Sequence, residues 1–300
     1  MLSKIPPLLT VNNALMDEQL LFESALLLGM AVAPVIWWTG RKDAAPYGRH
    51  HTNSGAGSRA VKAENMIAWN LLTLPTRITW FLMECPCLFF MVPIFCMGRY
   101  ANLKPPRILA ALFLLHYVHR ALVYPLRMRP SPKRNFPVII LISGVCFNIY
   151  NVYIQARSLS NFRSYPPTWL SSPQFVVGCM IFLFGMVTNV WADSILISLR
   201  KSSKGDAHSP ASTSPTESSS KMYKIPMGGL FDLVTCPNYL GEIIEWLGWA
   251  TATWSFAGLV FFVLTVCNLL PRALAHHQWY LINFPTIYPL KRKAIIPFIL

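Results

Sequence analysis

The chain has 300 residues, of which 54% are hydrophobic and 13% are charged, and its formal net charge is +14. A soluble domain usually carries about 25% charged residues. Apolar runs of membrane length recur along this chain, so the composition excludes an ordinary soluble protein and indicates a polytopic membrane protein. The basic residues lie between the apolar runs, where they are expected to contact anionic membrane lipid and not nucleic acid.

Seven apolar segments are expected to cross the membrane as helices within a single membrane domain that covers residues 1–300. Their approximate ranges are 20–38, 79–98, 108–126, 137–156, 173–199, 237–253 and 256–275. Residues 66–78 are also apolar, and we expect a re-entrant or surface segment there, interrupted at Pro75. No short apolar region with a small-residue cleavage site precedes the first span, so it is expected to remain in the mature protein.

The basic residues predict the orientation of the bundle. With these seven spans, 18 of the 26 Lys and Arg residues fall on one side of the membrane and six on the other. The positive-inside rule therefore predicts a luminal N-terminus and a cytosolic C-terminus. Residues Ser202–Ser220, SSKGDAHSPASTSPTESSS, are predicted to form a flexible Ser-rich cytosolic loop. The seven cysteines are dispersed, without the spacing of a metal site or a disulfide framework.

The segment Cys236–Ser255, CPNYLGEIIEWLGWATATWS, is apolar but contains Asn238, Glu242 and Glu245. Spacings of four and three place these side chains on one face of a helix. An unpaired carboxylate in hydrocarbon costs at least ~2.5 kcal/mol, so this face must look into a protein-lined cavity. The alternative is a buried polar network that only holds helices together.

Two further polar residues indicate carbonyl chemistry. Glu84 lies in the second expected span and Tyr117 lies near the end of the third. A protonated carboxyl group beside a phenol hydroxyl forms a donor pair for a ketone oxygen, and it stabilises the enolate formed when hydride adds to a conjugated ketone. The alternatives are that Glu84 pairs only with Arg120 and that Tyr117 only fills space.

Basic residues at the cytosolic ends of the spans are suited to a phosphate-rich cofactor. They are Arg120, Arg134, Arg200 and Lys224, and the polar side chains of Asn189, Asp193, Asn238 and Glu242 could bind its other groups. The positive-inside bias is an alternative explanation for the basic residues. No GxGxxG motif follows an expected strand, so any dinucleotide is expected to bind inside the helical bundle and not in a Rossmann domain.

Several motifs of this chain are similar to those of the steroid 5α-reductase family. They are PYGRH at 46–50, WFLME at 80–84, HYVHR at 116–120, Asn189 with Asp193, IPMGGLF at 225–231, NYLGEIIEW at 238–246, Tyr288-Pro289, and RKAIIPF at 292–298. They follow one another in register over most of the chain, so the chain resembles this family along nearly its whole length. Within the family it is most similar to the plant enzymes of brassinosteroid synthesis. The residues shared with them are Met83-Glu84, YPLR at 124–127, QAR at 155–157 and CPNY at 236–239.

The resemblance implies an all-α bundle of seven transmembrane helices. We expect the protein to lie in the endoplasmic reticulum membrane and to be a monomer. It would bind NADPH from the cytosolic side and a 3-oxo-Δ4 steroid from the lipid, and deliver hydride to C5 and a proton to C4 without a metal. Glu84 and Tyr117 match the positions that bind the 3-keto oxygen. The positions that match the cofactor cage are Trp80, Arg120, Arg134, Asn189, Asp193, Arg200, Tyr223, Lys224, Asn238, Glu242, Arg272, His276 and Tyr280.

The chain departs from its animal relatives at two of these places. Met83 stands where they have a glutamine beside the glutamate, and a thioether cannot donate a hydrogen bond. Met83 is therefore expected to pack against the steroid. Lys224 stands where they have arginine, which keeps the charge but loses bidentate geometry.

Three other functions remain open from the sequence. A trans-2-enoyl-CoA or polyprenol reductase would also reduce a conjugated or allylic double bond. An isoprenylcysteine-type methyltransferase would have similar C-terminal helices, but methyl transfer to a thiolate needs no carbonyl activator such as Glu84 and Tyr117. The third alternative is a non-enzymatic sterol-binding membrane protein.

Overall fold

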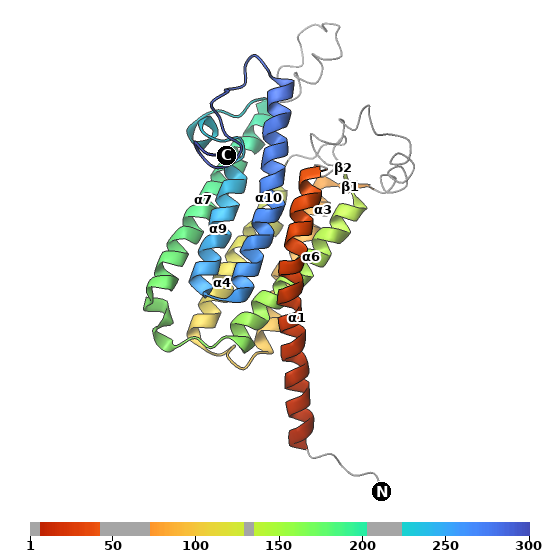
Figure 1. Ribbon diagram of the computed structural model, residues 1–300, viewed down its shortest axis with the longest axis vertical. Helices are drawn as coiled ribbons and strands as arrows, with labels where there is room; N and C mark the ends of the chain where they lie inside the picture. Colours follow the sequence, from red (N-terminus) through yellow and green to blue (C-terminus); the bar gives the residue numbers. More distant parts are fainter. Residues whose placement is uncertain (1–6, 43–72, 129–134, 203–223) are drawn as a thin grey trace.

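The computed structural model describes residues 7–42, 73–128, 135–202 and 224–300, and helices make up most of them (Figure 1). The long helices are α1 (Pro7–Lys42), α3 (Thr76–Cys96), α4 (Lys104–Val118), α6 (Val138–Arg157), α7 (Pro173–Ser202), α9 (Pro237–Thr253) and α10 (Phe256–Asn283). A π-helical turn, η2 (His119–Val123), and the short α5 (Tyr124–Arg127) continue α4, and a second π-helical turn, η3 (Ser158–Phe162), continues α6. The strands β1 (Thr73–Pro75) and β2 (Asn135–Pro137) pair antiparallel, with Leu74 opposite Phe136.

Among the described residues, six helical segments are long and apolar enough to cross a membrane. They correspond to six of the seven expected spans, so the chain is a multi-pass membrane protein. The remaining expected span is α9, which has 17 residues and carries Glu242 and Glu245. That length is at the lower limit for a membrane-crossing helix.

Two boundaries differ from the sequence prediction. The last helix continues to Asn283, so Arg272, His276 and Tyr280 all lie on α10, whereas the sequence placed the latter two beyond the last span. Pro75 does not interrupt a helix but precedes α3, which starts at Thr76. Residues 66–72 of the expected re-entrant segment lie outside the described residues, as does the expected Ser-rich loop apart from Ser202, the last residue of α7.

The long helices run alternately up and down the bundle, and α1 extends beyond one end of it (Figure 1). The C-terminal segment folds against the opposite end, beside the C-terminal end of α7. There the chain from Val234 to Cys236 pairs with Lys293 and Ala294 through backbone hydrogen bonds, such as Thr235 N to Lys293 O at 2.8 Å. This pairing fixes the chain immediately before α9, at the end where α9 carries Asn238.

Glycines allow α7 and α9 to pack backbone against backbone. A Cβ atom at Gly241 would lie 2.5 Å from the backbone nitrogen of Asn189 and 2.8 Å from the carbonyl oxygen of Gly185. One at Gly248 would lie 2.7 Å from the carbonyl oxygen of Gly178. Small residues at such positions are a usual means of close helix association in membranes. They bring the polar residues of α7 and α9 within hydrogen-bonding distance.

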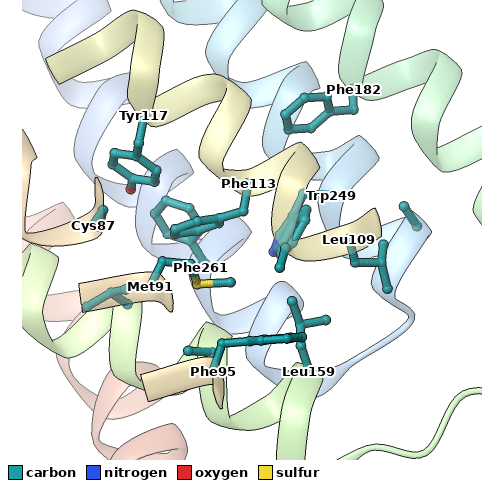
Figure 2. Packing of buried hydrophobic residues seen from close by; sticks show 14 of the residues in the cluster. Cys87, Met91, Phe95, Leu109, Phe113, Tyr117, Leu159, Phe182, Trp249 and Phe261 are labelled. Carbon is teal, nitrogen blue, oxygen red and sulfur yellow. The ribbon is translucent and has the colours of Figure 1, made fainter. Parts of the chain in front are cut away.

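A buried apolar cluster fills the bundle between α3, α4, α6, α7, α9 and α10 (Figure 2). Phe113 of α4 is in ring contact with Trp249 of α9 at a centroid distance of 5.5 Å and with Tyr117 at 4.7 Å. Tyr117 and Cys87 lie together at one edge of this cluster, with the tyrosine hydroxyl on the side of Cys87. The apolar cluster therefore fixes the tyrosine ring, and the polar site begins at its hydroxyl group.

Candidate functional site

Glu84 lies at the junction of two polar networks. Its side chain projects from α3 and is buried. One carboxylate oxygen, Oε2, accepts a hydrogen bond from Asn148 Nδ2 on α6 at 3.3 Å. The other, Oε1, lies 3.8 Å from Arg120 Nε. Glu84 therefore pairs with Arg120, as one of the two interpretations of the sequence predicted. Its other carboxylate oxygen belongs to a different network, which contains Tyr117.

One of the two networks contains Tyr117. The hydroxyl of Tyr117 accepts a hydrogen bond from Asn151 Nδ2 at 3.1 Å and donates one to Asn148 Oδ1 at 3.5 Å. Asn151 contacts Gln155, which in turn accepts a hydrogen bond from Trp249 Nε1 at 2.9 Å. Asn148, Asn151 and Gln155 are all nearly inaccessible to solvent. Glu84 and Tyr117 are thus connected through one side chain of α6, within a hydrogen-bonded row on that helix.

The other network surrounds Arg120. Its guanidinium group lies 3.5 Å from Asp193 Oδ2 on α7 and 3.4 Å from Glu242 Oε2 on α9, in addition to Glu84. It also lies over the ring of Trp80, 4.7 Å from the centroid. Three carboxyl groups, those of Glu84, Asp193 and Glu242, therefore surround one guanidinium group inside the bundle.

Arg120 lies in the π-helical turn η2, which extends α4. Single π-helical turns of this kind often occur at functional sites because they change the direction of one side chain. The turn begins two residues after Tyr117, and the side chains of Tyr117 and Arg120 belong to different networks.

Helices α7 and α9 complete the cage around Arg120. Asn189 Nδ2 donates to the carbonyl oxygen of Asn238 at 2.9 Å and to Glu242 Oε2 at 3.3 Å. Asn238 Nδ2 donates to Asp193 Oδ1 at 3.1 Å. The polar face predicted for α9 thus meets α7, and these side chains are hydrogen-bonded to one another. Glu245, on the same face, pairs instead with His116 Nδ1 at 2.8 Å.

The other predicted cofactor residues are only partly described. On α10, His276 Nε2 lies 3.3 Å from the hydroxyl of Tyr239, and Tyr280 stacks on Tyr288 with a centroid distance of 5.2 Å. Arg272 lies one helical turn before His276, and Lys224 is at the start of a described segment. The remaining predicted positions cannot be placed: Arg134 and Tyr223 lie outside the described residues, and Arg200 is on α7 without a described side chain.

The α6 residues near Glu84 and Tyr117 were not predicted from the sequence. Asn148, Asn151 and Gln155 are spaced by three and four residues, the same pattern that identified the polar face of α9. The pattern could therefore have been found. The pairing of His116 with Glu245 joins residues 129 positions apart, and no local pattern predicts it.

Several buried donors have no hydrogen-bond partner among the described residues. They include Trp80 Nε1, next to Arg120, and both Nε and Nη1 of Arg292. Arg292 lies in the C-terminal segment, is 1% exposed and packs over the ring of Tyr288 at 5.0 Å. Burial also raises the pKa of the Tyr288 phenol, so its hydroxyl stays neutral beside Thr235. Unpartnered buried donors are unusual, and these are suited to an acceptor-rich ligand.

The fold and the site define an α-helical membrane protein with a polar, charge-bearing centre enclosed by its helices. The family profile described as 3-oxo-5-alpha-steroid 4-dehydrogenase matches residues 134–300. The chain belongs to this family of oxidoreductases, the steroid 5α-reductases, and the resemblance seen in the sequence is confirmed.

Curated relatives extend the match to the N-terminal half. Steroid 5-alpha-reductase DET2 of Solanum lycopersicum is 40% identical over 85% of this chain and 88% of its own length. That of Gossypium hirsutum is 38% identical over 94% of this chain and 99% of its own length. The 3-oxo-5-alpha-steroid 4-dehydrogenase 1 of Mus musculus is 41% identical over 77% of this chain and 84% of its own length. A match over 94% of the chain spans the positions of Glu84 and Tyr117.

Proposed function

We propose that this protein reduces the Δ4 double bond of 3-oxo-Δ4 steroids with NADPH and yields 5α-3-oxosteroids. The observation that carries this proposal is the position of Glu84 between two networks. On one side it is linked through Asn148 to Tyr117, and on the other it faces Arg120. A ketone bound by Glu84 and Tyr117 would therefore adjoin the cage formed by Arg120, α7 and α9.

In this proposal Glu84 and Tyr117 donate hydrogen bonds to the 3-keto oxygen. NADPH, when bound, supplies the hydride that adds to C5 of the steroid. Negative charge then develops on the ketone oxygen, and donors already aimed at that oxygen stabilise it without reorganisation. The resulting enolate is protonated at C4. Trp246 and Phe113, which pack around Tyr117, hold the tyrosine ring in place.

The residues present fit a dinucleotide. Amide and carboxyl groups of α7 and α9 can bind hydroxyl and carboxamide groups, and Trp80 Nε1 is a buried donor without a described partner. The phosphates require cations, and Arg272 and Lys224 belong to the predicted cage. We add Arg292 to that cage, because its Nε and Nη1 are buried and lack a described partner. Bidentate donors of this type are typical of phosphate sites.

The membrane arrangement follows from the same proposal. We infer that α9 also crosses the membrane, which gives seven spans with a luminal N-terminus and a cytosolic C-terminus. Support comes from the alternating helix directions and from Lys291, Arg292 and Lys293 at the end of the bundle that holds the cage. NADPH is cytosolic, so the cage must open to that side. We assign the protein to the endoplasmic reticulum and expect a monomer.

Plant relatives named steroid 5-alpha-reductase DET2 favour a sterol of the brassinosteroid pathway as the substrate. The relative from mouse has similar identity, so a compact animal-type steroid is the second candidate. Purified protein in nanodiscs should oxidise NADPH when campest-4-en-3-one, progesterone or testosterone is added, and mass spectrometry should find a product heavier by two hydrogen atoms. Oxidation only with a trans-2-enoyl-CoA or a polyprenal, or methyl transfer from S-adenosylmethionine, would contradict the proposal.

A further inference from the structure

Asn148 of α6 lies where the two proposed carbonyl donors meet. Its side-chain nitrogen Nδ2 donates to Glu84 Oε2 at 3.3 Å, and its oxygen Oδ1 accepts from the hydroxyl of Tyr117 at 3.5 Å. The residue is 4% exposed. One amide group therefore contacts both Glu84 on α3 and Tyr117 on α4, although neither helix carries it.

A third contact fixes the direction of this amide. Asn148 Nδ2 also donates to the backbone carbonyl oxygen of Met83 at 2.7 Å, which is the shortest of these contacts. The thiol of Cys87, one turn further along α3, donates to Asn148 Oδ1 at 3.3 Å. An amide has two donor hydrogens and two acceptor lone pairs. One donor hydrogen of Asn148 bonds to the Met83 carbonyl and one lone pair accepts from Cys87. The second hydrogen then faces Glu84, and the second lone pair faces Tyr117.

The anchored amide leaves the hydroxyl proton of Tyr117 available. Because Asn151 donates to the tyrosine oxygen at 3.1 Å, the hydroxyl proton must point away from Asn151. It points toward Asn148 Oδ1, but at 3.5 Å this contact is at the limit of a hydrogen bond. A ketone oxygen entering between Tyr117 and Glu84 offers a better acceptor. The asparagine thus holds the hydroxyl in its donating orientation before substrate binds.

The same amide also restricts Glu84. With Oε2 held by Asn148, Oε1 faces Arg120, and the carboxyl group cannot rotate freely between the two networks. A catalytic donor must be held close to its productive geometry to stabilise a developing charge. We propose that Asn148 is a positioning residue that orients Glu84 and Tyr117 toward the ketone oxygen of the substrate. This inference rests on the proposed function and deepens it.

The test uses two changes at this position. Asn148→Leu has a similar size and removes every polar contact. Asn148→Asp keeps the acceptor atom and the shape but replaces the donor that faces Glu84 and the Met83 carbonyl. Asn161→Leu is the matched control, because Asn161 is also buried but lies in η3, where its side-chain Oδ1 accepts a hydrogen bond from the backbone N–H of Arg99 at 3.5 Å, at the other end of α6.

We expect kcat to fall roughly 10- to 100-fold in both Asn148 variants, while KM for NADPH changes less than about twofold. In a double-mutant cycle, Asn148→Leu combined with Tyr117→Phe should lose less activity than the product of the two single losses, because the residues act as a unit. The Asn161→Leu control should lower the unfolding temperature without lowering kcat.

Two results would overturn the inference. One is a wild-type kcat in both Asn148 variants. The other is a double variant, Asn148→Leu with Tyr117→Phe, whose loss of activity equals the product of the two single losses. If Asn148→Leu fails to fold, Asn148→Asp replaces it in the double-mutant cycle. NADPH binding, measured by tryptophan fluorescence, then checks that the variant is folded. Failure of the proposed function would appear differently, because the wild-type protein itself would then not oxidise NADPH with any 3-oxo-Δ4 steroid.

Discussion

At the scale of single residues, Glu84 determines how the site is interpreted. A glutamate that pairs only with an arginine would be structural, whereas this glutamate contacts Arg120 with one oxygen and Asn148 with the other. Its second connection leads to Tyr117, the only other residue to which the sequence analysis assigned a role in carbonyl activation. In the proposed function, the site therefore has a carbonyl side and a cofactor side, with Glu84 between them.

The change Glu84→Gln keeps the size of the side chain and removes its acidity. We expect kcat to fall roughly 10²–10³-fold, the loss typical when one oxyanion donor is removed. The Kd for NADPH should remain nearly unchanged, because Asp193 and Glu242 still pair with Arg120. Steady-state kinetics and cofactor titration measure both quantities. A variant with wild-type turnover would exclude Glu84 from the mechanism.

Met83 is expected to act through packing. Its side chain lies against α6, where a Cβ atom at Gly144 would overlap it, and its backbone carbonyl anchors Asn148. In Met83→Gln this carbonyl remains, and Glu84 and Tyr117 still supply two donors for one ketone oxygen. We expect kcat to change less than about tenfold, with a larger change in preference between bulky-tailed sterols and compact steroids.

Competition between campest-4-en-3-one and progesterone measures that preference for the Met83→Gln variant. A change in turnover of about 10²-fold on both substrates would show that position 83 takes part in the reaction itself.

At the scale of helices, the α7–α9 pair forms most of the cage around Arg120. The glycines at 185 and 241 bring the two backbones together, and the amide of Asn189 then reaches both Asn238 and Glu242. Every cage contact between these helices depends on that approach.

The changes Asn238→Ala and Glu242→Ala therefore test the cofactor side alone. Each removes one polar contact from a buried partner: Asp193 loses the contact with Asn238, and Arg120 and Asn189 lose those with Glu242. We expect the KM for NADPH to rise much more than the KM for the steroid. Thr251→Ala, which removes an exposed hydroxyl bonded within α9, is the control. An effect confined to the steroid KM would contradict the division of the site into two sides.

The helices themselves could be predicted from sequence, because hydropathy along the chain determines where a membrane-crossing segment lies. Six expected spans correspond to helices that can cross a membrane. The polar face of α9, for which a protein-lined cavity was expected, is hydrogen-bonded to α7, as in the alternative of a buried polar network. The end of α10 could not be predicted in this way. The expected span ended at residue 275, before His276 and His277. In the structure these two histidines lie on α10, and their rings contact the hydroxyl groups of Tyr239 and Thr235.

The contacts of the α6 residues with Glu84 and Tyr117 could not be predicted from the sequence, because they are made between different helices. The polar face of Asn148 and Asn151 is visible in the spacing, but nothing local shows that it meets Glu84 and Tyr117. The π-helical turn that carries Arg120 likewise has no sequence signature, because its geometry depends on the helices around it.

At the scale of the whole molecule, the two ends of the bundle differ. The end that holds the cage also holds the C-terminal segment with Lys291, Arg292 and Lys293, whereas Arg99, Arg107 and Arg163 lie toward the other end. In sealed microsomes, external protease should remove an epitope tag attached after Leu300, and a tag placed before Met1 should be degraded only after detergent is added. The reverse pattern would contradict the proposed orientation.

The central claim is hydride transfer to C5 of a conjugated steroid ketone, and isotope transfer tests it most directly. The purified protein is given a 3-oxo-Δ4 steroid and NADPH that carries deuterium at the transferable position of the nicotinamide. The account predicts a saturated 3-oxosteroid with one deuterium on C5, in the 5α configuration, and a solvent-derived hydrogen at C4. A product without deuterium, or with deuterium on the C3 oxygen-bearing carbon as in simple ketone reduction, would contradict the account.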